Sequence, residues 1–406
     1  MFNEKLISKK ISVIDIFIFI TIVLLSTNTY VKVSRIPIFL YFLVSLFIIM
    51  VYKRIKSNKN ILIVNKRYYI FYYVSLIFLF FGCISFFKNY SASGDIKIFA
   101  NLVINIMSMF TISIYIDSIK RLKIVLLSII AGLIVNFIAV FFELSYGLRF
   151  VELIDDYVRM FKGIPLSFYS NANDFATYLG CVLFILFFYY YFLNSKKSKF
   201  FIILIFGVTI YVILLTKSRG GLFFVISFLA IYFFFLLINK FGIYGKKRLL
   251  FYLIIFLMYS VIFIYIINSK YVSLFDLNGR YELWSNILSG YSNNSFLPMG
   301  LYGTYTNNGT IVFISGTSHF FFLEILAKYG IFMLILILIL YFKLFIVKKS
   351  TKNVFLINAF LISFLFLQIS TSGIGKMYLL WCIAGVLISY KYKLTKESEL
   401  IVTNNN

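Results

Sequence analysis

A short turn between two long apolar runs carries Lys217 and Arg219, and Gly220 and Gly221 open the next predicted helix. An arginine guanidinium holds phosphate oxygens through two parallel hydrogen bonds, which a lysine cannot do. Glycines in the first turn of a helix let an anion approach backbone N–H groups, although small residues there also serve helix packing. The pattern predicts an anion site at Arg219. Lys217 either assists it or, as is more usual, extends its amine to lipid headgroups.

The single histidine of the chain, His319, lies where a long loop enters an apolar helix. A histidine can accept a proton from a hydroxyl group near neutral pH, while an interfacial histidine with one hydrogen bond is the simpler interpretation. The same loop holds Arg280, at the start of an amphipathic stretch at 280–290. This stretch predicts a helix on the membrane surface with Trp284 as its anchor. Arg280 then either lies over an external cavity or touches lipid phosphate.

The carboxylates predict no metal site. Glu324, one turn after His319, is spaced to pair with Lys328, or else it faces the cavity as a substrate contact. The sequence contains no DxD motif, which a metal-dependent nucleotide-sugar enzyme would be expected to carry, and its three cysteines lie in apolar runs without CxxC spacing. Four acids are predicted to form a solvated acidic surface or to accept hydrogen bonds from sugar hydroxyls: Glu143, Glu152, Asp155 and Asp156.

The surrounding chain is 62% hydrophobic and 13% charged, with a mean hydropathy of +0.96. No soluble core absorbs so much apolar surface, so the composition predicts an all-α, polytopic membrane helix bundle. Apolar runs of about 20 residues, the length that crosses a bilayer, predict about twelve transmembrane helices in one integral membrane domain, 1–406. The predicted spans are 12–29, 36–52, 68–87, 98–116, 122–142, 174–193, 199–216, 221–239, 249–268, 321–341, 354–370 and 374–390.

Lysine and arginine are unevenly distributed between these runs. With the N-terminus in the cytoplasm, the inner segments carry 26 basic residues and the outer loops carry 12, which follows the positive-inside rule. Both termini are therefore predicted to be cytoplasmic. The net charge of +25 is attributed to topology and to contact with membrane lipids, and not to nucleic acid.

Two external loops are longer than simple connections. One spans 143–173, and the larger, 269–320, joins the ninth and tenth helices. They separate N-terminal helices (12–142), core helices (174–268) and C-terminal helices (321–390). Any chemistry is therefore predicted on the external side.

Several short segments together resemble the signature of the O-antigen polymerase/ligase family. In chain order they are TKSRGG, GRYELW, PMGLYG and SHFFFLEILAKYG, preceded by YSNANDFATYLG at 169–180, which adds Asn173. The resemblance covers about residues 165–335. The family comprises bacterial membrane glycosyltransferases that act on undecaprenyl-diphosphate-linked glycans, and the resemblance implies catalytic roles for Arg219, Arg280 and His319. Many relatives carry asparagine after the histidine, where this chain has Phe320.

The resemblance implies a multi-pass enzyme of the bacterial cytoplasmic membrane whose active site faces outward. The expected reaction is a one-step, inverting transfer from a lipid diphosphate, without metal or cofactor. A set of substrate-binding residues is expected around it: Lys217, Asn173, Gly220, Gly221, Trp284 and Glu324.

The first prediction is a polymerase that joins undecaprenyl-diphosphate-linked oligosaccharide repeat units into a capsular, exo- or O-antigen polysaccharide. A flippase and a chain-length regulator are the protein partners that this implies. One alternative is a ligase that moves lipid-linked glycan to another acceptor. The other is a flippase or transporter of the lipid-linked unit, but charged residues avoid the middle of the predicted spans, where a transporter would concentrate them.

Overall fold

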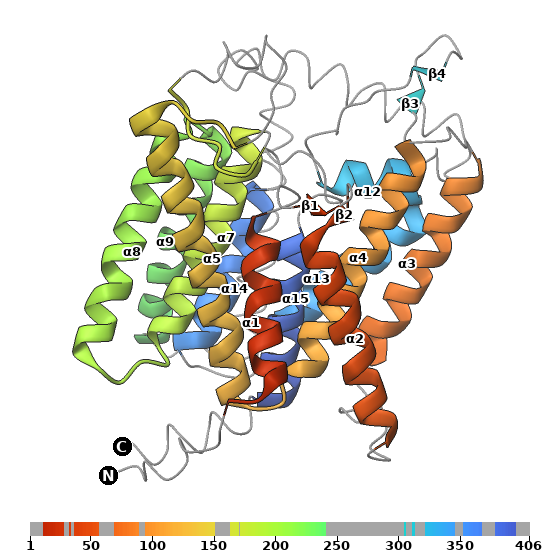
Figure 1. Cartoon of the computed structure of the whole chain (residues 1–406), viewed down its shortest axis with the longest axis horizontal. Helices are drawn as coiled ribbons and strands as arrows, with labels where there is room; N and C mark the ends of the chain where they lie inside the picture. Colours follow the sequence, from red (N-terminus) through yellow and green to blue (C-terminus); the bar gives the residue numbers. More distant parts are fainter. Residues whose placement is uncertain are drawn as a thin grey trace.

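The described part of the chain is a bundle of α-helices (Figure 1). The computed structural model describes residues 11–27, 32–33, 36–56, 69–88, 94–150, 163–169, 171–240, 304–305, 311–312, 321–345, 352–367 and 378–394. Within these residues lie twelve α-helices, which confirms the predicted all-α class. The strands are only two residues long and form two small antiparallel pairs, β1 (Lys32–Val33) with β2 (Ile36–Pro37) and β3 (Thr304–Tyr305) with β4 (Ile311–Val312).

The helices coincide with the apolar runs of the sequence. The predicted span at 249–268 lies outside the described residues, and each of the other predicted runs contains a helix. In chain order the helices are α1 (Val13–Ser26), α2 (Ile38–Lys56), α3 (Tyr69–Lys88), α4 (Gly94–Tyr115), α5 (Ile119–Tyr146), α7 (Ala172–Tyr190), α8 (Lys196–Leu215), α9 (Arg219–Lys240), α12 (Phe321–Tyr329), α13 (Ile331–Leu344), α14 (Lys352–Leu367) and α15 (Tyr378–Ser389), with a π-helical turn at Tyr390–Leu394.

Six of the described helices are long and apolar enough to cross a membrane: α3, α4, α5, α7, α8 and α9. Their outward surfaces are apolar as well, as shown by the exposed side chains of Phe80, Ile203 and Phe233. A helix that is apolar on all sides needs either a protein interior or lipid around it. The bundle is therefore compatible with a multi-pass membrane protein.

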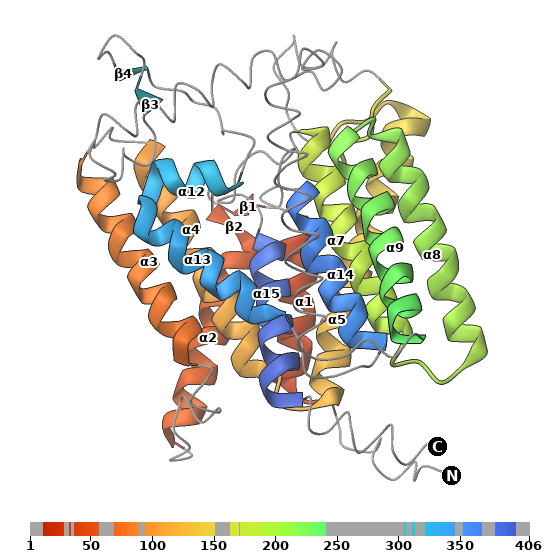
Figure 2. The ribbon, with the colours of Figure 1, turned by 180° about the vertical axis from the view of Figure 1, so that it is seen from behind.

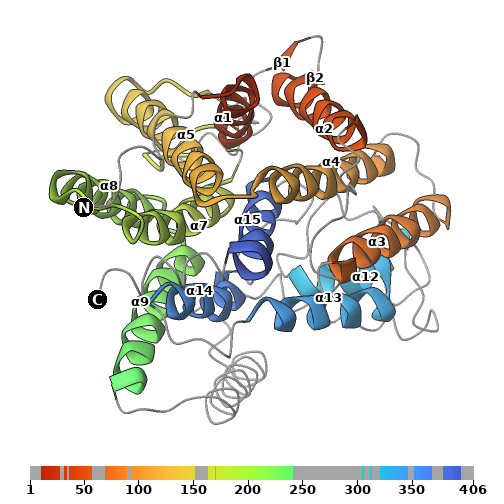
Figure 3. The same ribbon diagram turned by 90° about the horizontal axis from the view of Figure 1, so that it is seen from below.

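Consecutive long helices run antiparallel, so the bundle has two distinct ends (Figures 1 and 2). We call the end where α7 and α9 begin the Arg219 end, and the end where α1, α5 and α8 begin the Asp15 end. Helix α7 is the most enclosed of the six long helices, with an almost unbroken run of buried side chains between Phe175 and Phe188. It packs against α5, α8, α9 and α14, while α4 packs against α15 (Figure 3). The start of α7 is consequently held in place at the Arg219 end by the helices around it.

The tenth predicted span is not one helix. Gly330 adopts φ +82° between α12 and α13, a left-handed conformation that favours glycine, and its N–H caps α12 by donating to the carbonyl oxygen of Leu326 over 2.9 Å. Helix α12 lies across the Arg219 end, and α13 descends through the bundle from there (Figure 2). The prediction of a continuous helix at 321–341 is therefore wrong. The nine-residue α12 is strongly amphipathic, as suits a helix lying at a boundary.

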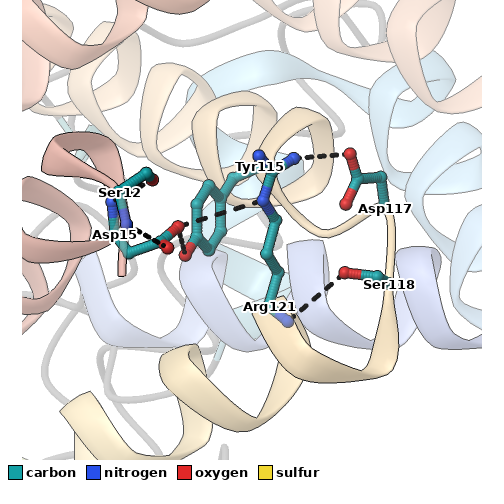
Figure 4. A network of polar contacts seen from close by, with 6 residues as sticks. All are labelled: Ser12, Asp15, Tyr115, Asp117, Ser118 and Arg121. Atoms are coloured by element: carbon teal, nitrogen blue, oxygen red, sulfur yellow. Dashed lines mark hydrogen bonds and ion pairs between the residues drawn. The ribbon is translucent and has the colours of Figure 1, made fainter. Parts of the chain in front are cut away.

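A polar network fastens the Asp15 end (Figure 4). The buried Asp15 forms a capping box with Ser12 at the start of α1 and accepts a 2.7 Å hydrogen bond from the Tyr115 hydroxyl at the end of α4. Arg121, in the first turn of α5, lies 3.9 Å from Asp15 and pairs with Asp117 at 2.5 Å. Three helices are thus joined around one carboxylate.

Candidate functional site

The turn between α8 and α9 places two cationic side chains at the Arg219 end. Helix α8 ends at Leu215 and α9 begins at Arg219, so only three residues connect them. Lys217 adopts φ +54°, and its N–H donates to the carbonyl oxygen of Leu214 over 3.1 Å. A non-glycine residue in this conformation costs about 1–2 kcal/mol. The side chains of Lys217 and Arg219 are both exposed, so both charges face outward from the turn.

Ser218 is the N-cap of α9, and it holds the backbone of the next residue, Arg219, at the start of the helix. Its hydroxyl oxygen accepts a hydrogen bond from the N–H of Gly221 over 3.3 Å, the usual N-cap arrangement. The same hydroxyl donates to the side-chain oxygen of Asn173 over 2.8 Å. The serine is buried, and its partner Asn173 is half-buried. The start of α9 is therefore tied to the start of α7.

Asn173 belongs to the first turn of α7, and its position is itself fixed locally. Asn171 is the N-cap of α7, and its side-chain oxygen accepts from the Asn173 N–H over 2.8 Å. The Thr177 hydroxyl donates to the Asn173 carbonyl oxygen over 2.8 Å. The predicted site residue Asn173 thus contacts the Arg219 turn through Ser218, and its side-chain oxygen serves the connection between two helices.

The two glycines of the turn have different surroundings. A Cβ at Gly221 would lie 2.9 Å from the Cβ of Ala176 and 3.3 Å from Ile213, so the missing side chain allows α9 to approach α7. Its N–H bonds to Ser218, so the structure gives Gly221 a packing and capping role, and its contact with an anion stays a prediction. Gly220 is the second residue of α9, where a backbone N–H has no acceptor within the helix. Gly220 is the glycine whose amide suits an anion.

Glu324 is buried in the first turn of α12 and pairs with Lys328, with 2.5 Å between carboxylate oxygen and amine nitrogen. The predicted i,i+4 pairing is confirmed. The pair sits in the short helix that begins two residues after His319. Both α12 and the α8–α9 turn lie at the Arg219 end (Figure 2).

Three of the predicted site residues, His319, Arg280 and Trp284, lie outside the described residues. The described portion of the predicted site therefore consists of the α8–α9 turn with the start of α7, and of α12, which lies at the same end but packs on α3 and α13, across the bundle from α8 and α9 (Figure 2). Among the described residues, no three side chains of histidine, cysteine, aspartate or glutamate lie together as in a metal site.

The structure corrects the interpretation of Glu143, which the sequence placed on a solvated acidic surface or among acceptors for sugar hydroxyls. Glu143 is 7% exposed, and its carboxylate accepts hydrogen bonds from the backbone N–H groups of Leu166 and Ser167, over 2.8 and 2.9 Å. Arg149 approaches the other carboxylate oxygen at 3.5 Å and also donates to the carbonyl oxygen of Ile164. Glu143 thus binds the loop at 163–169, which precedes α7, to the end of α5.

Asn136, in α5, is a buried polar residue that the sequence did not indicate as functional. Its side chain also joins α5 to the loop at 163–169. The Asn136 side chain donates to the carbonyl oxygens of Ser26 and Gly132 and accepts from the Ser167 hydroxyl over 2.7 Å. Its amide also donates to the Tyr178 hydroxyl over 3.3 Å. An asparagine inside a long apolar run is costly unless its hydrogen bonds are made, and this was the signal available in the sequence.

A cluster of aromatic rings covers the same loop. Tyr169 stacks on Phe175, with 5.5 Å between ring centroids, and lies 5.4 Å from the ring of Tyr178. Burial raises the pKa of Tyr169 well above its usual value, so this phenol stays neutral. The loop and the start of α7 are therefore rigidly held next to the Arg219 turn.

Comparison with protein-family models finds no match, and comparison with curated proteins finds none either. The geometry itself offers an exposed arginine and lysine on one turn, a helix N-terminus and a rigid base beneath them. Such an arrangement can hold an anionic group and stabilise negative charge that develops on it.

Proposed function

We propose that this chain is a membrane glycosyltransferase that polymerises undecaprenyl-diphosphate-linked oligosaccharide repeat units. The observation that carries the proposal is the hydrogen bond from Ser218 to Asn173. These residues are 45 positions apart, in two of the segments whose order resembles the O-antigen polymerase/ligase family. Their contact supports the proposal that these two segments belong to one site.

In the proposed reaction, a sugar hydroxyl of one lipid-linked glycan attacks the anomeric carbon of another. A new glycosidic C–O bond forms, the bond from the anomeric carbon to the diphosphate breaks, and the configuration inverts. His319 takes the proton of the attacking hydroxyl, and undecaprenyl diphosphate leaves with the bond's electron pair. Arg219 and Arg280 stabilise the negative charge on the departing diphosphate, with Lys217 and the Gly220 N–H beside them. Because the donor is already activated, the residues mainly supply positioning and charge.

The proposed topology has both termini in the cytoplasm, about twelve spans and the Arg219 end outside. Two observations support it. The long helices alternate in direction, as repeated membrane crossing requires (Figure 1). Clusters of lysine occur at the opposite, Asp15 end, as in the first turn of α8, which contains Lys196, Lys197 and Lys199.

The distribution of buried charge favours an enzyme over a transporter. The buried carboxylates among the described residues are Asp15, Glu143, Asp174 and Glu324, and each lies in the first or last turn of its helix. A transporter of the lipid-linked unit is expected to concentrate charged groups near the bilayer midplane. Charge at the helix ends suits chemistry at the membrane surface.

A ligase is the remaining alternative within the enzyme class, since it would use the same donor and leaving group. The glycan profile of a strain that lacks the gene separates the cases. Loss of a polymerase leaves single repeat units on the acceptor, loss of a ligase leaves long chains on the carrier lipid, and loss of a flippase traps units inside the cell. We expect single repeat units, and either other profile contradicts the proposal.

The role of His319 is tested in the same strain by complementation. His319→Ala, produced at wild-type level in the membrane, is expected to restore no polymer, because the attacking hydroxyl loses its base. Full polymer from this variant would rule out the histidine as the base.

A further inference from the structure

A second feature of the bundle lies at the opposite end from Arg219. A groove of about 390 Å³ runs between α7, α8 and α9 and reaches the start of α14. Helices α8 and α9 each pack on α7 and diverge from their common turn (Figure 3), and residues of all three helices line the groove. Its volume is at the lower end of the range for small-molecule pockets, ~300–1,000 Å³. It therefore suits one hydrocarbon chain and not a whole lipid.

The walls of the groove are apolar and aromatic. Its floor includes the buried Leu186 and Ile202, and its edges are the exposed side chains of Ile203 on α8 and Phe233 on α9. The hydroxyl groups of Tyr191 and Tyr232 hydrogen-bond to each other, so these tyrosines leave an aromatic surface toward the groove. Such a lining favours hydrocarbon over a water-soluble ligand.

Two lysines stand at the mouth of the groove. Lys352, the first residue of α14, lines it directly. Lys199, in the first turn of α8, lies with its amine 5.3 Å from the ring centroid of the groove residue Tyr190. A lysine ammonium at the edge of an apolar groove is complementary to a molecule with an anionic headgroup and an apolar tail.

The position of the groove along the helices places it within one leaflet. Along α8 it extends to Phe206, which is ten residues, or about 15 Å at 1.5 Å per residue, from the start of the helix at Lys196. The hydrocarbon core of a bilayer is about 30 Å thick. The groove thus lies within the half of the membrane that adjoins the Asp15 end.

We propose that this groove binds an anionic diacyl glycerophospholipid, with one acyl chain along Ile203 and Phe233 and the phosphate between Lys199 and Lys352. In the topology proposed above, this lipid belongs to the cytoplasmic leaflet, whose anionic lipids attract basic residues. The site is separate from the Arg219 turn and does not depend on glycosyl transfer. The bound lipid fills the space between α8 and α9 and stabilises the pair whose turn carries Arg219.

The test is native mass spectrometry of the full-length protein incubated with equal amounts of dioleoylphosphatidylglycerol and dioleoylphosphatidylcholine. The wild-type protein is expected to retain one phosphatidylglycerol in preference to phosphatidylcholine. The double variant Lys199→Gln/Lys352→Gln is expected to lose this preference, by about fivefold for each lysine. The matched control, Lys196→Gln/Lys197→Gln, removes two lysines of the same helix end that neither line the groove nor lie over the Tyr190 ring, and is expected to leave the preference unchanged.

A second variant tests the apolar part of the site. Ile203→Trp fills the groove from an exposed edge and is expected to abolish retention of both lipids. Unchanged retention in Ile203→Trp, or equal preference in the lysine double variant and the wild type, overturns the proposal. Displacement of phosphatidylglycerol by an equal concentration of undecaprenyl phosphate overturns it as well, because the groove would then serve the polyprenyl carrier.

Discussion

The hydroxyl of Ser218 donates a hydrogen bond to the side-chain oxygen of Asn173 over 2.8 Å, and so joins the N-cap of α9 to the first turn of α7. Ser218 is buried, Asn173 is half-buried, and the Ser218 oxygen also accepts from the N–H of Gly221. Arg219 follows Ser218 directly in the chain. The position of the guanidinium at this end of the bundle therefore depends on a serine that carries no charge.

Replacing Ser218 by alanine removes both bonds. The loss of the cap is expected to lower the free energy of unfolding by about 1 kcal/mol, measured by thermal unfolding in detergent. Transfer activity per folded molecule is expected to fall by about tenfold or more, because the arginine loses its fixed position. The control is Ser227→Ala, whose hydroxyl bonds only to a carbonyl of the preceding turn of α9. Wild-type activity in Ser218→Ala would show that the link to Asn173 does not position the site.

Gly221→Ala is expected to destabilise the protein by about 1–3 kcal/mol, because its Cβ would meet Ala176 at 2.9 Å. Thermal unfolding measures the effect. Ala176→Gly in the same chain should recover most of the loss, since it removes the atom that clashes. Gly207→Ala is the matched control: this glycine lies within α8 with open space around it, and alanine there is expected to stabilise the helix by up to about 1 kcal/mol. Equal effects at 207 and 221 would contradict the packing role of Gly221.

Glu143→Ala is expected to expose the amides of the loop that returns to α7. The carboxylate accepts from the N–H groups of Leu166 and Ser167, and a buried donor without its partner costs about 1–3 kcal/mol. Hydrogen exchange followed at these two amides should accelerate by more than tenfold, while amides in the middle of α5 keep their wild-type rates. Unchanged protection at Leu166 and Ser167 would mean that the carboxylate does not hold the loop.

Tyr115→Phe tests the opposite end of the bundle. The change removes the 2.7 Å hydrogen bond to the buried Asp15 and leaves the ring in place. The free energy of unfolding is expected to fall by about 1.5–3 kcal/mol, the usual range for a hydrogen bond to a charged group. Glycan transfer per folded molecule should remain unchanged, because this network lies at the opposite end of the bundle from the start of α9 (Figure 1). A selective loss of activity at full stability would point to a functional role for the Asp15 end.

The helices were predictable because hydrophobic runs of spanning length leave few alternatives to a membrane bundle. The break between α12 and α13 at Gly330 was not predicted, because the apolar run at 331–344 continues the apolar character of α12. Hydropathy therefore does not mark the change of direction. The amphipathic pattern of FFLEILAKY followed by glycine was the signal for it.

The individual residue types of the Arg219 turn indicated an anion site, and the pairing of Glu324 with Lys328 followed from helical spacing alone. The burial of Glu143 depends on amides more than 20 residues further along the chain, and no local pattern reveals such a partner. The contact between Asn173 and Ser218 is likewise set by how α7 and α9 pack, so only three-dimensional structure shows it.

The central claim is that Arg219 stabilises the departing lipid diphosphate. The most direct measurement is the rate at which purified full-length protein in lipid nanodiscs transfers glycan from an undecaprenyl-diphosphate-linked repeat unit. We expect Arg219→Gln to lower kcat by about 10²–10³-fold, the effect of removing a donor that acts on transition-state charge, and Arg219→Lys to recover only part of it. Lys217→Gln, in the same turn, should lower kcat by a much smaller factor. An Arg219→Gln protein that is folded and transfers glycan at the wild-type rate would contradict the account.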